Sequence, residues 1–499
     1  MLEALGVPSL EALVAETVPE AILCREPIDV GEGLGEAEAL SELERLVAPN
    51  QVLRSRIGMG YHDCVVPPVI ARNVLEDPAW YTAYTPYQAE IAQGRLEALL
   101  NFQTMVADLT GMEIANASLL DEGTAAAEAM SLCLGAAARG RDRFLVAPDC
   151  HPQTLEVVAT RAEAIDVEIV CQDPLEAELD DSFFGLLLQY PATDGVVHDY
   201  APLCARAADA GVLTVVAADL LALTLLRPPG EMGADVAVGS TQRFGVPLGY
   251  GGPHAAYLAT RGRLQRRLPG RVVGVSKDSR GRVAYRLALQ TREQHIRREK
   301  ATSNICTAQV LPAVLASMYG VYHGPEGLTD IARAVRRCAS IFAAGAEAAG
   351  HRVRAETFFD TVAVELVGAS ADEAVERARL RGTNIRRLGP TSISVAFDET
   401  ATEAEARELA EACLGAPSSF TAAAPADVPE PHARRSAFMT HEVFHRHRSE
   451  TEMLRYVQRL AAKDLSLTGS MIPLGSCTMK LNATAEMMPL SWPKLTGVH

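Results

Sequence analysis

Hydrophobic and polar positions in the middle of this chain follow a pattern that predicts strands and helices in turn. Between about residues 112 and 260, short apolar runs are separated by segments with helical spacing; these runs are 143–147, 167–170, 184–188, 213–217 and 234–238. Runs that are apolar at nearly every position are typical of strands buried on both faces of a parallel sheet. The pattern therefore predicts an α/β fold with a mostly parallel, doubly wound sheet.

The segments before this region have different patterns. Residues 1–50 place apolar side chains at helical spacing, as in 40–47, and a long helix is expected from about 88 to 111. Between them, the stretch from Arg56 to Gln88 is rich in Gly, Pro, Tyr and Trp. A solvated linker would not carry so many aromatic side chains, so we expect this aromatic loop to pack against another surface.

After the α/β region, the pattern from 352 to 414 predicts a small α+β unit. Strands are expected at 359–366 and 392–396, and helices at 372–381 and 402–413. A Pro, Ala and Ser-rich linker follows. The predicted parts are an N-terminal helical and aromatic-loop segment (1–110), a large α/β domain (111–330), a small α+β domain (331–415), the linker (416–433) and a truncated start of a further unit (434–499).

Composition and charge narrow the class of protein. The 499 residues carry a formal net charge of −17, which argues against nucleic acid or an anionic membrane as a partner. The ten cysteines are scattered singly, with no CxxC pair or Cys/His cluster, so no metal site is expected and a reducing cytosol fits. The N-terminus resembles neither a secretory signal nor a transit peptide, and no apolar run approaches the roughly 20 residues that span a bilayer. We therefore predict a cytoplasmic protein.

Three positions in the α/β region have the residue types of a pyridoxal-phosphate site. Thr124 lies at the start of a predicted helix, where free N–H groups and the helix dipole suit a phosphate. His151 follows the strand at 143–147, where an imidazole can stack on a cofactor ring, and Asp219 ends a later strand, where a carboxylate can keep a pyridinium nitrogen protonated. Taken singly, each has a simpler explanation: a capped helix, a loop histidine and a turn-capping Asp.

The residue that such a site needs most is missing. The segment Gly239-Ser-Thr-Gln-Arg-Phe-Gly-Val-Pro has the pattern of the strand end and turn where a pyridoxal-phosphate enzyme carries its Schiff-base lysine, yet Gln242 stands at that position. A carboxamide cannot form an imine because its nitrogen lone pair is delocalised. The nearest lysine along the chain is Lys277. We interpret this as a vestigial site that lacks its cofactor.

Two further segments offer candidate pocket residues. The aromatic loop contains Tyr84, Tyr87 and Gln88, which could line a pocket or simply pack a loop between subunits. The turn Pro473-Leu-Gly-Ser-Cys-Thr-Met-Lys480 places donors of Ser476, Cys477 and Thr478 beside a lysine, which suits a small carboxylate. The basic run 292–300 is interrupted by Glu, which favours a solvated helix over an anion-binding patch.

At these motifs the chain resembles the glycine cleavage system P-protein family, the pyridoxal-phosphate-dependent glycine dehydrogenases (decarboxylating). The resemblance covers essentially the whole chain. The matching stretches are Ile57-Gly-Met-Gly-Tyr, Trp80-Tyr-Thr-Ala-Tyr-Thr-Pro-Tyr-Gln, Asn101-Phe-Gln-Thr, Ile114-Ala-Asn-Ala-Ser-Leu-Leu-Asp-Glu, Gly239-Ser-Thr-Gln-Arg-Phe-Gly-Val-Pro, Gln290-Thr-Arg-Glu-Gln-His-Ile-Arg-Arg and Ile472-Pro-Leu-Gly-Ser-Cys-Thr-Met-Lys-Leu-Asn482.

The resemblance implies two homologous halves of pyridoxal-phosphate-dependent transferase fold type I, either in tandem or as separate subunits, with the lysine in the C-terminal half alone. This chain then corresponds to the N-terminal half plus the start of the C-terminal half, clipped at both ends. The complete protein is expected to decarboxylate glycine and to pass the aminomethyl group to the lipoyl arm of H-protein. The missing half is expected to bind the cofactor, and a dimer or heterotetramer is expected.

Three alternatives remain at this point. The chain is a fragment of a glycine dehydrogenase, inactive by itself, or a non-catalytic partner subunit that stabilises a separate lysine-bearing half. Residues 434–499 favour the fragment, because a dedicated subunit should end near 415–440. An independent fold-type-I enzyme, such as an aldolase or aminotransferase, is disfavoured by Gln242.

Overall fold

The computed structural model describes residues 1–26, 28–83, 85–301, 303–305, 307–422, 428–471 and 482–498. The chain forms two compact units, Met1–Pro49 and Asn50–His499. The first unit is helical and contains α1 (Leu2–Leu5), α2 (Leu10–Thr17), η1 (Glu20–Ile22) and α3 (Glu36–Val47). Ser9 caps α2 by accepting a hydrogen bond from the Ala12 backbone N–H.

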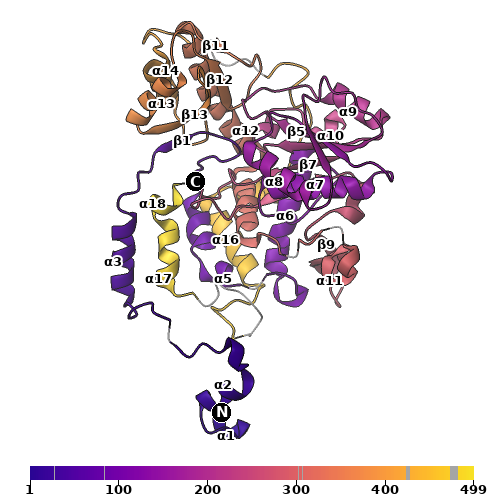
Figure 1. Cartoon of the computed structure of the whole chain (residues 1–499), viewed down its shortest axis with the longest axis vertical. Helices are drawn as coiled ribbons and strands as arrows, with labels where there is room; N and C mark the ends of the chain where they lie inside the picture. The colour runs from indigo at the N-terminus through magenta and orange to yellow at the C-terminus, as the bar shows by residue number, and fades with distance from the viewer. Residues whose placement is uncertain are drawn as a thin grey trace. The chain divides into compact units, whose positions relative to one another are not determined.

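A seven-stranded sheet forms the centre of the second unit (Figure 1). The strand order is β2-β8-β7-β6-β5-β3-β4. Five strands run parallel, whereas β8 is antiparallel to β7 and β2 is antiparallel to β8. The bounds are β2 (Ile114–Ala115), β3 (Arg143–Val146), β4 (Glu168–Cys171), β5 (Phe183–Tyr190), β6 (Leu213–Ala218), β7 (Val236–Ser240) and β8 (Ala256–Thr260). The predicted doubly wound, mostly parallel sheet is confirmed.

Helices cover this sheet because its strands are apolar on both faces. Every residue of β5 is buried, for example, so neither of its faces can remain in water. Helix α7 (Glu122–Ala136) packs across β5, β6, β7 and β8, and α8 (Pro152–Glu163) packs on α7. Helix α9 (Ala201–Asp209) packs on β6.

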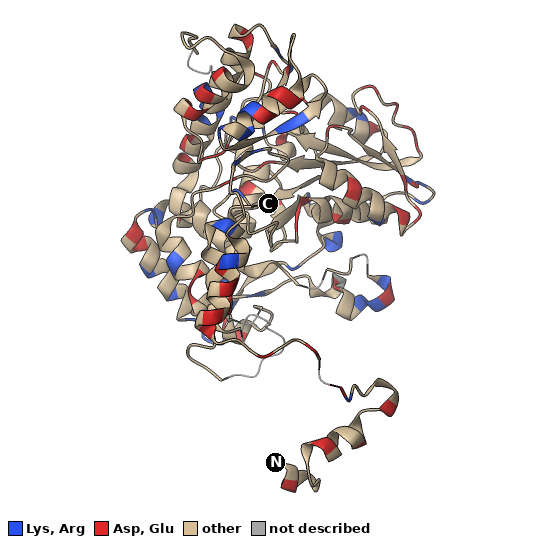
Figure 2. Cartoon of the chain, turned by 60° about the vertical axis from the view of Figure 1, so that its left-hand side comes forward, with Lys and Arg blue, Asp and Glu red and all other residues tan. Residues whose placement is uncertain are grey.

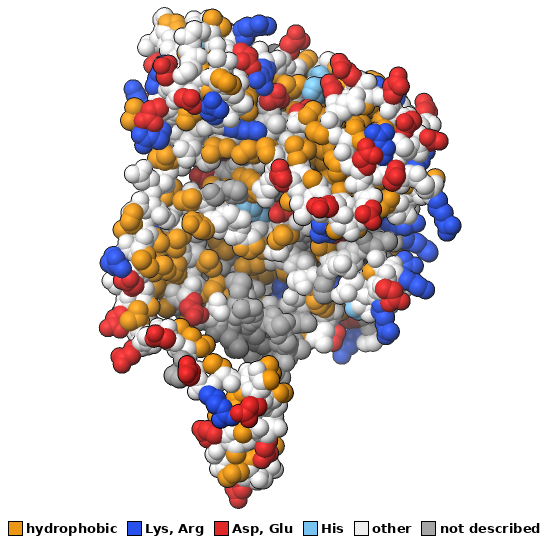
Figure 3. Space-filling view, viewed as in Figure 1, with side chains coloured by type: hydrophobic (Ala, Val, Ile, Leu, Met, Phe, Trp, Pro, Cys, Tyr) orange, Lys and Arg blue, Asp and Glu red, His pale blue; other side chains and the backbone are white. Residues whose placement is uncertain are grey.

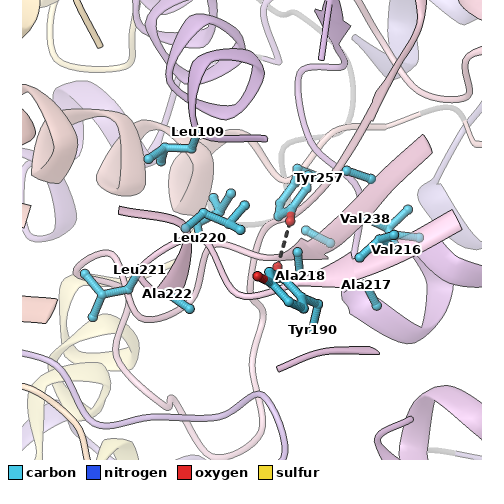
Figure 4. Packing of buried hydrophobic residues seen from close by; sticks show 14 of the residues in the cluster. Leu109, Tyr190, Val216, Ala217, Ala218, Leu220, Leu221, Ala222, Val238 and Tyr257 are labelled. Atoms are coloured by element: carbon cyan, nitrogen blue, oxygen red, sulfur yellow. Dashed lines mark hydrogen bonds between the residues drawn. The ribbon is translucent and has the colours of Figure 1, made fainter. Parts of the chain in front are cut away.

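The carboxyl end of β6 is closely packed, as Figure 4 shows. The Tyr257 hydroxyl donates a hydrogen bond to the Ala218 carbonyl over 2.7 Å. Gly239 on β7 lies against both groups: a Cβ there would stand 2.3 Å from the Ala218 oxygen and 2.8 Å from the Tyr257 hydroxyl. Only glycine fits, and this packing fixes where the chain leaves β6 at Asp219.

A second, five-stranded sheet has the order β1-β13-β14-β12-β11 and carries α13 (Ala371–Leu380) and α14 (Glu403–Leu414). Its strands are β1 (Arg54–Arg56), β11 (Arg352–Val353), β12 (Thr361–Glu365), β13 (Thr383–Gly389) and β14 (Ser392–Ala396). The predicted α+β pattern is present, with three strands, β1, β11 and β13, that the sequence did not predict. The buried Arg56 anchors β1 through ion pairs with Asp398 at 2.6 Å and Glu405 at 3.1 Å.

Helix α6 (Gln93–Thr110) packs against both α12 (Val310–Ala348) and α16 (Glu450–Ala461). Gly324, with φ 63°, interrupts α12. The Asp464 carboxylate, just after α16, accepts hydrogen bonds from the backbone N–H groups of Gly94 (2.7 Å) and Arg95 (3.0 Å). The segment after the linker therefore returns to cap the N-terminus of α6.

The remaining elements are short. The proposed domain boundaries at 110, 330, 415 and 433 stay a prediction. A two-stranded ribbon consists of β9 (Val273–Lys277) and β10 (Val283–Leu287), and η6 (Gln290–Arg292), α11 (Gln294–Arg297) and η7 (Arg298–Lys300) follow it. The others are α4 (Pro68–Ile70), η2 (Ala71–Leu75), α5 (Pro78–Tyr81), η3 (Ala89–Ile91), η4 (Ala222–Thr224), α10 (Pro229–Met232), η5 (Gly262–Arg267), α15 (Val443–Arg446), α17 (Thr484–Met487), η9 (Met488–Ser491) and α18 (Pro493–Thr496).

Candidate functional site

A polar recess opens at the carboxyl ends of the parallel strands. Its empty space measures about 510 Å³, its open mouth included. This is the edge where ligands usually bind in open α/β sheets. The polar side chains that line it come from both sheets and the loops between them: His62, Glu122, His151, Gln189, Thr193, Asp219, Ser240, Arg243, Asp360 and Thr361.

An arginine lies between two carboxylates in this recess. Arg243 Nη1 donates to Asp360 Oδ2 over 2.7 Å and also to Asp219 Oδ2. Asp219 leaves β6 and Asp360 precedes β12, so Arg243 connects the large sheet to the small one. The other oxygen of Asp219, Oδ1, accepts from the backbone N–H groups of Leu221 (2.7 Å) and Ala222 (3.1 Å). Both oxygens of Asp219 are therefore in use.

The pKa values of this triad follow from burial and from the ion pairs. Burial raises the pKa of Asp219, but the charge of Arg243 and the hydrogen bonds from Arg243 and the Ala222 N–H outweigh it, so the pKa lies below its usual value. For Asp360, burial wins over the attraction of Arg243, and the pKa lies above its usual value. Burial lowers the pKa of Arg243, but the two carboxylates raise it by more. The arginine stays charged.

Two histidines complete the wall of the recess in their neutral form. Burial, followed by the charge of Arg243, lowers the pKa of His62 to about 3. Burial, followed by the charge of His62, lowers the pKa of His151 to about 3 as well. His151 Nδ1 lies 3.0 Å from the Thr193 hydroxyl oxygen. Neither ring therefore adds a cation to the site at neutral pH.

Gln242 is completely buried behind the recess and fully hydrogen-bonded. Its Oε1 accepts from the His62 backbone N–H over 2.9 Å, and its Nε2 donates to the carbonyls of His62 and Val246, each over 2.7 Å. The amide therefore ties the loop at His62 to the turn after β7. Both of its N–H donors are in use, and its buried oxygen already accepts one hydrogen bond, so the amide offers no donor to a ligand.

The start of α7 is acidic where an anion would need to bind. Asp121 Oδ1 accepts from the Thr124 backbone N–H over 2.8 Å, and Glu122 accepts from the Thr154 hydroxyl over 3.1 Å. Burial raises the pKa of Glu122 to about 7. Side-chain oxygens thus already use the helix N-terminus, and a phosphate there would face two carboxyl groups.

The His62, Asp219 and Asp360 ligand atoms lie within 4.8 Å of one another, a spacing that could hold a metal ion. The Arg243 guanidinium already binds both carboxylates. A metal cation between them would meet that positive charge at close range, so this group does not fit a metal site.

Comparison with known proteins shows the family to which the chain belongs. The family model of the glycine cleavage system P-protein matches residues 1–413. The chain belongs to this family. It is 54% identical to glycine dehydrogenase (decarboxylating) of Nostoc punctiforme and 57% identical to that of Thermosynechococcus vestitus. Each alignment covers 100% of this chain and 52% of the relative, so the chain spans about half the length of the curated relatives it matches.

Solved structures agree with this assignment. A crystal structure of glycine decarboxylase (P-protein) of the glycine cleavage system, in inhibitor-bound form, matches with a TM-score of 0.76 and 37% identity, over 83% of this chain and 97% of that one. A NifS-like protein matches with a TM-score of 0.51 and 12% identity, over 72% of this chain, which shows the fold alone. The predicted fold type I of the pyridoxal-phosphate-dependent transferases is confirmed.

Pyridoxal phosphate does not fit this P-protein recess. The position predicted for the imine holds the hydrogen-bonded amide of Gln242. The carboxylate predicted for the ring nitrogen, Asp219, is bound to Arg243, and the helix start predicted for the phosphate carries Asp121 and Glu122. Each end of the cofactor would therefore meet a group that is already satisfied or of the same charge.

The site residues expected from the sequence fall into three groups. His151 and Asp219 line the recess together, whereas Thr124 lies on the first turn of α7, outside the lining. Tyr87 and Gln88 lie outside it too; the Arg271 guanidinium stacks 4.2 Å above the Tyr87 ring. Tyr84, Ser476, Cys477 and Thr478 lie outside the described residues. Their role in a pocket stays a prediction.

Sequence reasoning missed His62, Arg243 and Asp360. Arg243 directly follows Gln242 in the same motif, so its position carried a signal. Asp360 carried none, because it lies 117 residues from Arg243 along the chain.

Proposed function

We propose that this chain is the lysine-free half of a glycine dehydrogenase (decarboxylating). The complete protein would use pyridoxal phosphate, bound by the half that this chain lacks, to release the carboxylate of glycine as CO2. It would then transfer the aminomethyl group to the lipoyl arm of H-protein. The names of the relatives and the half-length alignment support this proposal.

The single observation that carries the proposal is the state of Gln242. Its amide is buried and saturated by the backbone of His62 and Val246, which leaves this half without an imine-forming group. In the proposed protein, this half stabilises the fold of the lysine-bearing half. A dimer or heterotetramer located in the cytoplasm is part of the same proposal.

A second candidate function differs only in covalent connection. The chain would be a non-catalytic subunit that stabilises a separate lysine-bearing half. Gln242 supports both candidates equally. The packing of residues 450–464 onto α6 favours one continuous polypeptide, because the segment after the linker is an integral part of this unit.

The aromatic loop and the Ser476 turn are the parts of this chain that we propose to border the catalytic pocket of the other half. The Tyr87 ring is already held by Arg271, and Gln88 is exposed. Gln88 is therefore accessible to a neighbouring domain. Ser476, Cys477 and Thr478 belong to the same proposal on the strength of the family motif.

The proposal is tested by trapping the cofactor. The chain and the complete protein are each incubated with pyridoxal phosphate, reduced with borohydride and mapped by mass spectrometry. The complete protein should carry one reduced adduct beyond residue 499 and release labelled CO2 from carboxyl-labelled glycine in the presence of H-protein. A stoichiometric adduct on Lys277 or Lys480 of this chain would contradict the proposal.

A further inference from the structure

Basic residues gather in one segment of this acidic chain. Residues 261–300 hold thirteen Lys and Arg against three Asp and Glu, although the whole chain carries −17. The segment is thus about +10, and the remainder of the chain is correspondingly more acidic. A charge separation of this size creates a local field that can direct the approach of a partner.

The structure places many of these cations on one exposed feature. We call it the basic ribbon: β9, β10 and the helical turns α11 and η7 after them, with the exposed cations Lys277, Arg280, Arg286, Arg297, Arg298 and Lys300. Lys and Arg are visible around α11 in Figure 2 and along the lower right edge in Figure 3. The structure gives these six cations no ion pair with any described residue, whereas Arg282 nearby is paired with Asp278 at 2.8 Å.

Apolar side chains are exposed among these cations. Val275 and Val283 on the ribbon are 64% and 66% exposed, and Ile296 on α11 is 50% exposed. Lys277 pairs with Val283 across the ribbon, and Val275 pairs with Tyr285, so these side chains share one face. Arg286, opposite Gly274, lies on the other face of the ribbon, so cations are exposed on both faces and the apolar pair lies beside Lys277.

The ribbon is held rigidly by two glutamines of α6. Gln103 donates from Nε2 to the Val273 carbonyl (3.1 Å) and accepts at Oε1 from the Val273 N–H (2.8 Å). Gln93 makes the same pair of bonds with Tyr285, at 2.8 and 2.9 Å. Each amide thus satisfies one backbone position of a strand. A surface that is ordered before binding loses little entropy when a partner docks.

The charge of the rest of the molecule selects the kind of partner. The Debye length is about 8 Å at physiological ionic strength, so a small acidic domain at the ribbon would not sense the acidic remainder. A long nucleic acid or a flat anionic membrane would extend beyond the ribbon and be repelled. We infer that the basic ribbon docks the acidic face of a compact protein domain. We identify this domain as the lipoyl-bearing H-protein, and this identification rests on the proposed function.

The test uses the complete protein with lipoylated H-protein and glycine. The variant K277E/R280E/R286E reverses three ribbon cations that lie outside the recess. The KM for H-protein should rise about tenfold or more, and its dependence on salt should weaken, because rim charges steer association. The KM for glycine and kcat at saturating H-protein should stay unchanged.

A matched control reverses three exposed arginines elsewhere, on α12, α13 and α16: R333E/R379E/R455E. It changes the net charge equally and should leave the KM for H-protein within about twofold of wild type. Thermal unfolding checks that both variants are folded. An equal rise of the KM for H-protein in both variants, or no rise of this KM in the ribbon variant, would overturn the inference.

Titration of fluorescently labelled H-protein with the complete protein measures the Kd of docking directly, without catalysis. If the complete wild-type protein released no CO2 from glycine, the proposed function would be contradicted. If the ribbon variant bound H-protein as tightly as the wild type, the docking surface would be contradicted. Ribbon-dependent binding of phosphatidylserine vesicles or of single-stranded RNA, with no binding of H-protein, would also overturn the inference.

Discussion

Arg243 dominates the electrostatics of the recess. It is 6% exposed and forms ion pairs with both Asp219 and Asp360, which come from opposite sides of the site. His62 and His151 stay neutral beside it, because burial makes a further charge too costly. Arg243 therefore occupies the place beside Asp219 that a protonated cofactor ring nitrogen would need.

Replacing this arginine should destabilise the fold. Arg243→Met leaves two carboxylates unpaired in a buried site, and breaking a buried ion pair typically costs about 3–5 kcal/mol. The free energy of unfolding, from urea titration, should fall by that amount. The double variant R243M/D360N removes one of the two charges and should recover part of the loss. Wild-type stability in R243M would show that the ion pairs are not structural.

The two neutral histidines predict a dependence of stability on pH. The pKa of His62 is about 3 in the folded protein, well below its unfolded value near 6.5. Between these values the unfolded chain binds the extra proton, so stability falls as pH falls from 6.5 toward 3. In His62→Gln the slope of unfolding free energy against pH should be smaller by about 1.4 kcal/mol per pH unit. Parallel profiles for the two proteins would show that His62 does not titrate this way.

The sequence predicted part of this residue-scale arrangement. His151 and Asp219 share the recess because both follow parallel strands, and strand ends meet at one edge of a sheet. Gln242 could be identified by its motif alone. Arg243 could not be understood that way, because its role depends on Asp360, which only the packing of the small sheet brings within 2.7 Å.

At the scale of elements, Gly239 sets the spacing of three strands. A Cβ at this position would collide with Ala218 on β6 and Tyr257 on β8. Gly239→Ala should therefore lower the unfolding free energy by about 1–3 kcal/mol through overpacking. Gly33→Ala is the control, because a Cβ there meets no atom within 4 Å. Equal stability of the two variants would mean that the strands can separate without cost.

The elements that the sequence missed are those that only tertiary contacts define. β1 has three residues, Arg54 to Arg56, with no apolar alternation, and it forms because β13 offers a parallel edge and Asp398 and Glu405 bind Arg56. The solvated helix predicted over 292–300 is present only as the short α11 between the 3-10 helices η6 and η7, because Arg298 adopts a positive φ of 55°. Long strands such as β5 were predictable because nearly every residue in them is apolar, which is the pattern of a strand buried on both faces.

At the scale of the whole molecule, the described part of the chain is an intact α/β fold without a fitting cofactor site. Within the described residues, no helix is both long and apolar enough to cross a lipid bilayer. The chain also aligns with only about half of its curated relatives. In the proposed function, this chain therefore acts together with the half that it does not contain.

Co-expression tests this dependence. This chain, combined with the polypeptide that covers the remaining half of its relatives, should release CO2 from glycine in the presence of H-protein. Each part alone should release none, because this chain lacks the lysine and the other part lacks its partner surface. The measurement is labelled CO2 from carboxyl-labelled glycine. Full activity of the remaining half alone would show that this half is dispensable.

The hydrogen bonds of Gln242 to His62 and Val246 also limit which side chains this position accepts. Gln242→Lys would remove the acceptor that the His62 N–H uses and add a second cation next to Arg243. The change would be harmful until Arg243 and the acidic start of α7 changed too. One substitution at residue 242 therefore does not suffice to give this recess an imine-forming lysine in a suitable setting, because Arg243 and the acidic start of α7 would remain.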